Sequence, residues 1–461
     1  MILRNVEVEG LTGLDVRLAA GRVAEIGPRL AKFGDDLDGR GGALIPGLAD
    51  HHIHIFGLAA QAASVDLSGI ASPADFRARI EAAAAERPPG AWVRAIGYHE
   101  TLAGELSREI LDTLAPRHRL RVQHQTGSLW MLNSAGLAAV GEGGLPEVLE
   151  RDAAGRPTGR VWRGDAWLRE RIGAEPPPLA NIGSRLASYG VTALTDASIT
   201  TDQAAAGRLA EAHRTGELPQ ALTVMSGGAL EAPPDRAFRV GAVKMLLDEH
   251  ELPPIEEFAA RIGRARAWRR AVAVHCVTAA ELAVALAALE TAGARPGDRI
   301  EHGGVIPQAT IGLLKAAGVT VVTQSSFIHD RGDRYLTQVP AAELKDLYRC
   351  ASLIRAGVPV AGSSDAPYAS PDPWAGIAAA IERRTRGGKS LGPEERIAPD
   401  VALNLYLGRS EAPGGPPRQL RVGMTADLCL LKAPLADALA TPGAELVRCA
   451  LIGGEIAWLS P

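Results

Sequence analysis

Residues 41–57 read GGALIPGLADHHIHIFG and place His51, His52 and His54 directly after a short apolar run. The chain has only 11 histidines in 461 residues, so three within four positions is an unusual concentration. The run Ala-Leu-Ile is typical of a buried strand, which Pro46-Gly47 interrupts. Side chains two apart on a strand point to the same face, so His52 and His54 should project together while His51 faces the other way. The stretch therefore predicts a pair of imidazoles at the end of a buried strand.

Seven further β-type runs follow along the chain, and Ala-rich helical segments separate most of them. The runs are VTALTDAS (191–198), ALTVMSG (221–227), AVKMLLD (242–248), AVAVHCV (271–277), DRIEHGG (298–304), VTVVTQSS (319–326) and VPVAGSSDA (358–366). Strand–helix alternation favours parallel pairing through right-handed crossovers. With the first run, eight such units predict an α/β fold, a closed (β/α)8 TIM barrel.

One interval breaks this rhythm, at about residues 62–180. It is too long for a single crossover and holds two more strand-like runs, WVRAIGY (92–98) and LRVQHQTG (120–127). We interpret it as an insertion after the first barrel strand that forms part of the pocket wall. Both ends of the chain also contain short strands, and Gly453-Gly454 is typical of a hairpin turn. We expect a barrel over 46–411 and a small composite β domain from 1–45 and 412–461.

Composition limits the classes of function. The chain carries 49 Lys and Arg against 53 Asp and Glu, a net charge of −4. This balance argues against nucleic acid or an anionic membrane as a main partner. The four cysteines are far apart and form no CxxC pair, as expected in a reducing compartment. The first residues, MILRNVEVEG, lack a signal-peptide pattern, so we expect a cytoplasmic protein.

Polar side chains recur at the ends of the predicted barrel strands. The set is His52 and His54 on the first run, Lys244 in the fourth, His275 on the fifth, His302 on the sixth and Asp365 on the eighth. Alone, each has an ordinary explanation: a core histidine, a surface lysine, a helix cap. Because the carboxyl ends of barrel strands meet at one rim, the six side chains should converge. Imidazoles and a carboxylate are ligands that suit zinc or a similar divalent ion.

The motifs GLADHHIH, VAVHCV, RIEHGG and AGSSDAP resemble those of the metal-dependent amidohydrolase superfamily. The insertion, LWMLNSAGL at 129–137 and the strand lysine resemble its amidohydrolase 3 branch, which includes N-substituted formamide deformylases. The resemblance runs along nearly the whole chain and implies that the two termini build a β-sandwich. The family's metal-ligand positions carry over to His52, His54, His275, His302 and Asp365.

The sequence departs from the branch in two places. Many members have Asp-Gly-His before the Asn-Ser pair, whereas Ser128 stands where that histidine would fall. A substrate-contacting imidazole is then absent or supplied by His124. The lysine strand continues LLDEHELP in place of the more usual Asp-Gly-Ser, so the substrate is expected to differ from those of the better-known members.

The resemblance implies hydrolysis of a C–N bond in an amide, formamide, urea or carbamate. One or two divalent ions, most simply zinc, would activate a water molecule, and Asp365 would shuttle its proton to the leaving nitrogen. Carbamylated Lys244 would bridge two ions, whereas with one ion Lys244 would be a hydrogen bonder outside the ligand set. Alternatives are a phenylurea or thiocarbamate hydrolase, ester, phosphotriester or deaminase chemistry at the same site, and a non-catalytic scaffold. A deaminase would need a catalytic glutamate near His275, and Glu281 follows six residues later.

Other side chains are candidates for orienting ligands or contacting substrate. Asp196 and Gln324 end the second and seventh runs, where each could orient a histidine. Aromatic residues in strand-end loops or the insertion indicate a partly apolar small-molecule substrate if they line the pocket; the candidates for substrate binding are His124, Trp130, Gln324 and Phe327. No cluster of Arg or Lys accompanies the ligand positions, which disfavours a phosphorylated substrate. A homodimer is the commonest oligomer and is our expectation.

Overall fold

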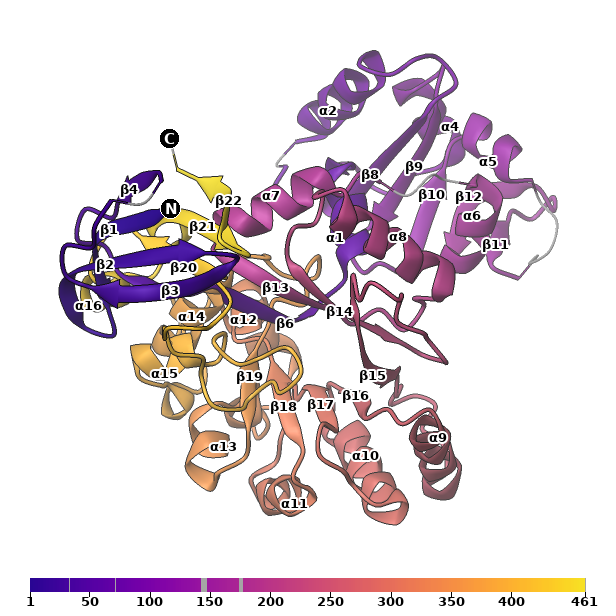
Figure 1. Ribbon diagram of the computed structural model, residues 1–461. Coiled ribbons are helices and arrows are strands. Elements are labelled where there is room, and N and C mark those ends of the chain that lie inside the picture. The colour runs from indigo at the N-terminus through magenta and orange to yellow at the C-terminus, as the bar shows by residue number, and fades with distance from the viewer. Residues whose placement is uncertain (33, 71, 142–146, 174–176, 461) are drawn as a thin grey trace. The chain divides into compact units, whose positions relative to one another are not determined.

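The computed structural model describes residues 1–32, 34–70, 72–141, 147–173 and 177–460 (Figure 1). The chain forms two compact units, residues 1–55 with 179–461 and residues 56–178. We call the first the barrel unit and the second the inserted unit. The barrel unit contains an eight-stranded parallel sheet and two four-stranded sheets, and the inserted unit contains a six-stranded sheet.

The eight parallel strands follow one another around the barrel in sequence order. They are β6 (Leu48–Ile53), β13 (Val191–Asp196), β14 (Ala221–Ser226), β15 (Arg239–Met245), β16 (Val272–Cys276), β17 (Arg299–His302), β18 (Thr320–Thr323) and β19 (Val360–Gly362). Most of their residues are buried, as parallel strands covered on both faces require. The predicted α/β barrel and all eight of its strand runs are confirmed.

Backbone hydrogen bonds join the first strand to the chain just beyond the last one. The amide of Asp365 donates to the carbonyl of His52, and the amide of His54 donates to the carbonyl of Ala366, both at 2.8 Å. We call this junction the seam. It brings two predicted ligand positions from opposite ends of the barrel sequence side by side.

Helices follow most of the barrel strands, although β14 leads to β15 without one in the described residues. These helices are α7 (Ala180–Ser188), α8 (Gln203–Arg214), α9 (Ile255–Ala267), α10 (Ala279–Ala292), α11 (Ile311–Ala317), α12 (Ser326–Gln338), α13 (Ala351–Ala356), α14 (Pro373–Glu382) and α15 (Pro399–Asn404). Helix α10 shows how the sequence sets their ends: Thr278 and Glu281 form a capping box, and Gly293 ends the helix. Figure 1 shows α9, α10, α11 and α13 outside the strands β15 to β19.

Pro46-Gly47 divides the opening stretch between two sheets. Strand β5 (Leu44–Pro46) pairs antiparallel with β20 (Leu428–Leu431), whereas β6 starts the barrel after a single intervening residue, Gly47. A Cβ atom on Gly47 would lie 2.2 Å from a side-chain carbon of Thr192, so only glycine fits at this crossing. The interruption in the apolar run is therefore the point where the chain leaves one sheet for the other.

The two termini build a pair of sheets with one core. Their orders are β3-β2-β1-β4 and β22-β21-β20-β5, from the strands β1 (Ile2–Val8), β2 (Leu11–Ala19), β3 (Arg22–Gly27), β4 (Asp36–Asp38), β21 (Val447–Ile452) and β22 (Glu455–Leu459) with β5 and β20. Leu3, Val16, Leu430 and Leu451 belong to the shared core. Helix α16 (Leu435–Ala440) follows β20, and both chain ends lie here in Figure 1. The residue limits predicted for the domains stay a prediction.

The inserted unit is an α/β layer of its own. Its sheet runs β11-β12-β10-β9-β8-β7, with β7 (Val65–Asp66), β8 (Trp92–Tyr98), β9 (Arg119–His124), β10 (Leu129–Leu132), β11 (Leu149–Arg151) and β12 (Pro157–Trp162). Its helices are α2 (Pro73–Ala85), α3 (Glu100–Ala103), α4 (Arg108–Leu114), α5 (Ser134–Val140) and α6 (Asp165–Ile172), after α1 (Ile55–Ala62) leads in. Within the described residues, none of the helices has the length and apolar character needed to cross a bilayer.

Candidate metal centre

His52, His54 and Asp365 meet at the seam. The Nε2 atoms of His52 and His54 lie 3.4 Å and 3.2 Å from Oδ1 of Asp365. One ligand atom from each residue lies within 4.8 Å of the other two, a grouping that could hold a metal ion. Oδ1 of Asp365 is buried, yet it makes no hydrogen bond within the described part of the chain. A buried carboxylate oxygen facing two imidazole nitrogens without a hydrogen bond fits a cation among the three donors.

His302 and His275 continue this group around the barrel. The rings of His302 and His52 have centroids 4.8 Å apart, and those of His275 and His302 are 4.5 Å apart. Nδ1 of His302 lies 3.7 Å from Oδ2 of Asp365. Four predicted histidines and the predicted aspartate therefore come together at the carboxyl ends of β6, β16, β17 and β19.

The backbone at two of these positions is strained. His302 has φ of 70° and Asp365 has φ of 53°, in the left-handed region that residues other than glycine rarely adopt. Such a conformation costs about 1–3 kcal/mol and is typical of active sites, where the surrounding structure holds it in place. At Asp365 the seam hydrogen bond to His52 supplies that restraint.

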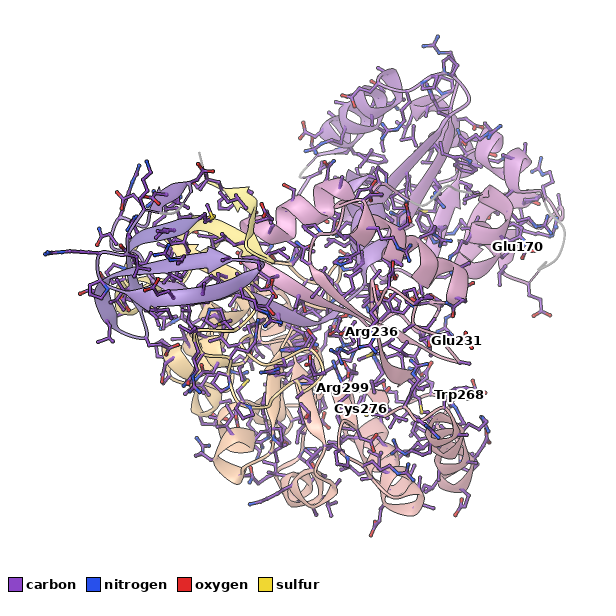
Figure 2. The ribbon with its side chains drawn as sticks, viewed as in Figure 1. Glu170, Glu231, Arg236, Trp268, Cys276 and Arg299 are labelled. Atoms are coloured by element: carbon purple, nitrogen blue, oxygen red, sulfur yellow. The ribbon has the colours of Figure 1, made fainter. Side chains whose placement is uncertain are left out.

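A buried glutamate orients His52. Oε2 of Glu301 makes a short hydrogen bond with Nδ1 of His52. A carboxylate only accepts, so Nδ1 carries the proton and the lone pair of Nε2 faces Asp365. Arg299 donates to both oxygens of Glu301, at 2.9 Å for one of them. Arg299 and Cys276, both labelled in Figure 2, lie on the neighbouring strands β17 and β16.

Each of two further histidines also has a fixed partner. Oε1 of Gln324 lies 2.9 Å from Nδ1 of His302, and the amide nitrogen of Gln324 donates to Ser363. The hydroxyl of Ser198 lies 3.0 Å from Nδ1 of His54. Gln324 thus has the orienting contact predicted for it. Asp196 instead accepts hydrogen bonds from the amides of Ile55 and Ser198 and from the hydroxyl of Thr201, so it joins the residue after His54 to the loop after β13.

Lys244 is buried beside the same group. Its Nζ lies 3.5 Å from Nε2 of His52. Burial lowers the pKa of Lys244 below its ordinary value, and the charges of Glu301 and Asp365 partly oppose that effect. The amine therefore lies in the barrel interior, as its alternation with apolar residues in the fourth run predicts.

The electrostatics favour neutral imidazoles. Burial lowers the pKa of His52 and His302 well below the ordinary value and that of His275 to about 4, and the charge of Lys244 adds to the effect on His52 and His275. Burial alone would raise the pKa of Glu301, but Arg299 and Lys244 bring it below its ordinary value. Neutral imidazoles beside an ionised carboxylate are the protonation states that ligate a divalent cation.

His51 lies between Asp50 and the ligand pair but takes no part in the cluster. Its ring is fully buried, and neither ring nitrogen has a hydrogen-bond partner in the described residues. Burial first, and then the charge of Arg299, lower its pKa to about 3. Asp50 accepts hydrogen bonds from the amides of His52 and Ser364, which ties the first strand to the last a second time.

Three of the candidates for substrate binding are packed in cores or lie in the inserted unit. Trp130 is buried in a cluster with Leu132 and Trp167 of that unit. Phe327 is 2% exposed and packs against Tyr348. His124 ends β9 in the inserted unit. Their roles in substrate binding, and that of Gln324, stay predictions.

Two functional side chains were missed from the sequence, Glu301 and Ser198. The signal for Glu301 was partial: Arg299 and Glu301 lie two apart on a strand predicted to be buried, which predicts a charged pair on one face but not that this face is the inner one. Ser198 had no such signal, because its contact with His54 depends on a loop after β13.

Comparisons with known proteins agree with this geometry. The model of the amidohydrolase family matches residues 36–457. The N-substituted formamide deformylase of Arthrobacter pascens is 25% identical over an alignment of 506 positions, which covers 94% of this chain and 93% of the relative. The putative amidohydrolase YtcJ of Bacillus subtilis (strain 168) is 22% identical, and the alignment covers 81% of this chain and 80% of the length of YtcJ.

A solved structure is similar over the full length. The crystal structure of an uncharacterized metal-dependent hydrolase from Pyrococcus horikoshii OT3 has a TM-score of 0.76 at 19% identity and covers 99% of both chains. At 19% identity, this similarity supports the fold and carries no conclusion about function. The resemblance to the amidohydrolase 3 branch and the expected enzyme class, a hydrolase acting on C–N bonds, are both confirmed by the family match and the relatives. From its first barrel strand to its last, the chain belongs to the amidohydrolase family.

Proposed function

We propose that the protein is a metal-dependent hydrolase that cleaves the C–N bond of an amide, formamide, urea or carbamate. The observation that carries this proposal is that Oδ1 of Asp365 faces Nε2 of both His52 and His54 and makes no hydrogen bond to any residue the structure describes. When bound, a divalent cation such as zinc supplies Lewis acidity and lowers the pKa of water to about 7. His52, His54, His275, His302 and Asp365 would hold it, joined by Lys244 with two ions.

Asp365 is the proposed proton shuttle. Its carboxylate takes a proton from the attacking water as the new C–O bond forms, and delivers that proton to the leaving nitrogen as the C–N bond breaks. The side chain is 8% exposed, so the carboxylate is largely shielded from bulk water. The left-handed backbone conformation of Asp365 and the seam hydrogen bond of its amide set the direction of the carboxylate.

Lys244 is the proposed site of carbamylation. Its unprotonated amine would attack carbon dioxide, forming an N–C bond and releasing one proton to solvent. Burial favours this reaction because it lowers the pKa of the amine and because the product replaces a buried cation with a ligating anion. The carbamate would then lie beside His52, because Nζ of Lys244 is 3.5 Å from Nε2 of His52.

The deaminase alternative loses its candidate glutamate. The carboxylate of Glu281 accepts hydrogen bonds from the amides of Val277 and Thr278 at 2.6 Å and 3.0 Å, as part of the capping box of α10. A carboxylate committed to a helix end is not free to move a proton to a substrate ring. Hydrolysis of an amide, formamide, urea or carbamate is therefore the function we favour over deamination.

We propose a small, partly apolar substrate and a cytoplasmic location. The ring of Tyr368 lies 5.7 Å from that of His54 and is 62% exposed, so it offers an apolar face beside the ligand group. The similarity to a formamide deformylase supports N-substituted formamides as the first compounds to test. All four cysteines are buried and unpaired, as expected in a reducing compartment.

Elemental analysis joined to a substrate panel tests the proposal. The purified protein should contain a stoichiometric divalent metal and hydrolyse at least one member of a panel of N-substituted formamides, ureas, carbamates and N-acyl amino acids. Release of the amine and of the acid should be measured together, because both products must appear in equal amounts. Metal-loaded protein that hydrolyses no compound in the panel would favour a non-catalytic scaffold.

A further inference from the structure

The inserted unit carries a second group of imidazoles. Strands β8 and β9 are parallel neighbours, and Tyr98 pairs in register with His124. His99 follows directly after β8, and His124 ends β9. The amide of Gln125 donates to the carbonyl of Tyr98 at 2.7 Å, which fixes the two strand ends side by side. Two histidines remote in sequence are thus brought to one edge of this sheet.

Glu100 completes the group between the two rings. Its Oε2 lies 3.1 Å from Nε2 of His124 and 3.9 Å from Nε2 of His99. The ring centroids of the two histidines are 5.6 Å apart, with planes at 32°. One ligand atom from each of the three residues lies within 4.8 Å of the others. Zinc–ligand bonds of about 2.0–2.2 Å in tetrahedral geometry require donor separations of about 3.4 Å, so small side-chain movements suffice.

The far nitrogen of each ring has the same kind of partner. Both strand ends carry His-x-Thr, with Nδ1 of His99 2.9 Å from the hydroxyl of Thr101 and Nδ1 of His124 2.8 Å from the hydroxyl of Thr126. The backbone amides of Thr101 and Thr126 also donate to these nitrogens, at 3.2 Å each, so as the contacts stand Nδ1 accepts and Nε2 of His124 donates to Glu100. When Nε2 binds a cation instead, Nδ1 carries the proton and donates to the threonine hydroxyl. This pairing sets the ring orientation in the way that partners of metal-bound histidines do.

We propose that His99, Glu100 and His124 form a second binding site for a divalent transition ion such as zinc. Two imidazoles and one carboxylate are a donor set that zinc accepts, and three protein donors leave a fourth position for water or a small ligand. The side chains of His99 and Glu100 are 41% and 42% exposed, whereas that of His124 is 11% exposed, so the open position faces solvent. The site lies wholly in the inserted unit and depends on none of the barrel ligands.

A chelator-stripped, full-length protein dialysed against buffered zinc tests the proposal. In the variant His52→Ala/His54→Ala, which removes the barrel pair, we expect one equivalent of zinc to remain bound. Adding His99→Ala/His124→Ala should remove that equivalent. With the barrel intact, His99→Ala/His124→Ala should bind one equivalent less than the unsubstituted protein, so the result does not depend on the folding of the barrel variant.

Two milder variants separate a metal site from a plain hydrogen-bonded triad. Glu100→Gln keeps a polar side chain at an exposed position and should lose the zinc equivalent without changing the melting curve of the metal-free protein. Thr101→Val/Thr126→Val leaves all three donors and should weaken zinc binding about tenfold. As a matched control, His250→Ala removes an exposed imidazole 4.0 Å from the carboxylate of Glu249. This variant should leave the zinc content and the melting curve unchanged.

The proposal is overturned by either of two results. One is equal zinc content in the intact-barrel protein with and without His99 and His124. The other is a loss of zinc from Glu100→Gln no larger than that from His250→Ala, since the three residues would then form only a His–Glu hydrogen bond. The visible absorption spectrum of Co²⁺ gives an independent readout. The spectrum of an ion ligated by imidazole and carboxylate differs from that of the ion free in solution.

Discussion

Glu301 accepts a hydrogen bond from Nδ1 of His52, and this contact fixes both the tautomer and the direction of the imidazole at the centre of the barrel site. Both side chains are fully buried. Arg299 neutralises the far side of the carboxylate, so the chain Arg299–Glu301–His52 ends in a lone pair that faces Asp365. The residue next to a ligand in sequence therefore orients a different ligand, 249 positions away.

Glu301→Gln should weaken metal binding. An amide oxygen can still accept from Nδ1, but it lacks the charge that makes the imidazole a stronger ligand, and Arg299 is left with an uncompensated buried charge. We expect the affinity of the barrel site for zinc to fall about 10–100-fold, measured by competition with a chelator. Glu281→Gln, at a buried glutamate of the α10 capping box, should lower the melting temperature and leave this affinity unchanged.

Asp365→Asn and His54→Ala should separate metal binding from turnover. Asparagine keeps an oxygen beside the imidazoles but cannot carry a proton, so we expect the metal content to stay and kcat to fall about 10²–10⁴-fold. His54→Ala should lose both the metal and the activity. Full activity in Asp365→Asn would refute its role as proton shuttle. Metal content by elemental analysis and kcat on the best substrate of the panel are the two measurements.

Carbamylation of Lys244 predicts a dependence on carbon dioxide. Protein loaded with metal in ¹³C-bicarbonate should show one carbamate resonance in its ¹³C spectrum, and Lys244→Ala should lack it. The exposed Lys315 provides a control, because Lys315→Ala should keep the resonance. An unmodified lysine in a metal-loaded, active enzyme would leave Lys244 as a hydrogen bonder near His52.

Asp372 makes the stability of the fold depend on pH. It caps α14, and burial raises the pKa of its carboxyl to about 6, although the amide of Trp374 donates to it. The folded state thus holds the proton more tightly than the unfolded chain, whose pKa is about 3.9. The stability that Asp372 contributes is present in full below about pH 4 and is lost as the pH rises through about 6.

Asp372→Asn should remove this dependence and keep the cap, because asparagine caps helices as well as aspartate does. At pH 8 we expect the variant to melt higher than the unsubstituted protein by on the order of 1 °C or more, and at pH 4 the two should agree. Scanning calorimetry across this range gives the difference directly. A constant gap at all pH values would assign the effect to packing instead of to ionisation.

The barrel and most of its site could be predicted from the sequence because polar residues recur at the ends of the apolar runs. Buried parallel strands are continuous apolar runs, and a polar residue that ends such a run must lie at the rim. His302 is the last residue of its strand, and His52 and His275 are each the last but one. Asp365 lies three residues beyond β19, but its place at the end of the eighth predicted run already assigned it to the same rim.

Glu301 shows where the period-two pattern fails. Neighbours on a strand should face opposite sides, so with His302 at the rim Glu301 would be assigned to the outer face. The left-handed backbone at His302 turns that residue at the end of β17, and both side chains reach the site. The contacts of Ser198 and Asp50 depend on loop and seam geometry in the same way, which no local pattern encodes.

The seam also determines when the site can come into being. Ser364 and Asp50, which hydrogen-bond across it, are separated by 314 positions in the chain, and His52 and Asp365 are nearly as far apart. During synthesis the first imidazole pair leaves the ribosome long before its carboxylate partner exists. Cation capture by the complete set is therefore necessarily a late event in biogenesis, after almost the whole barrel has been translated.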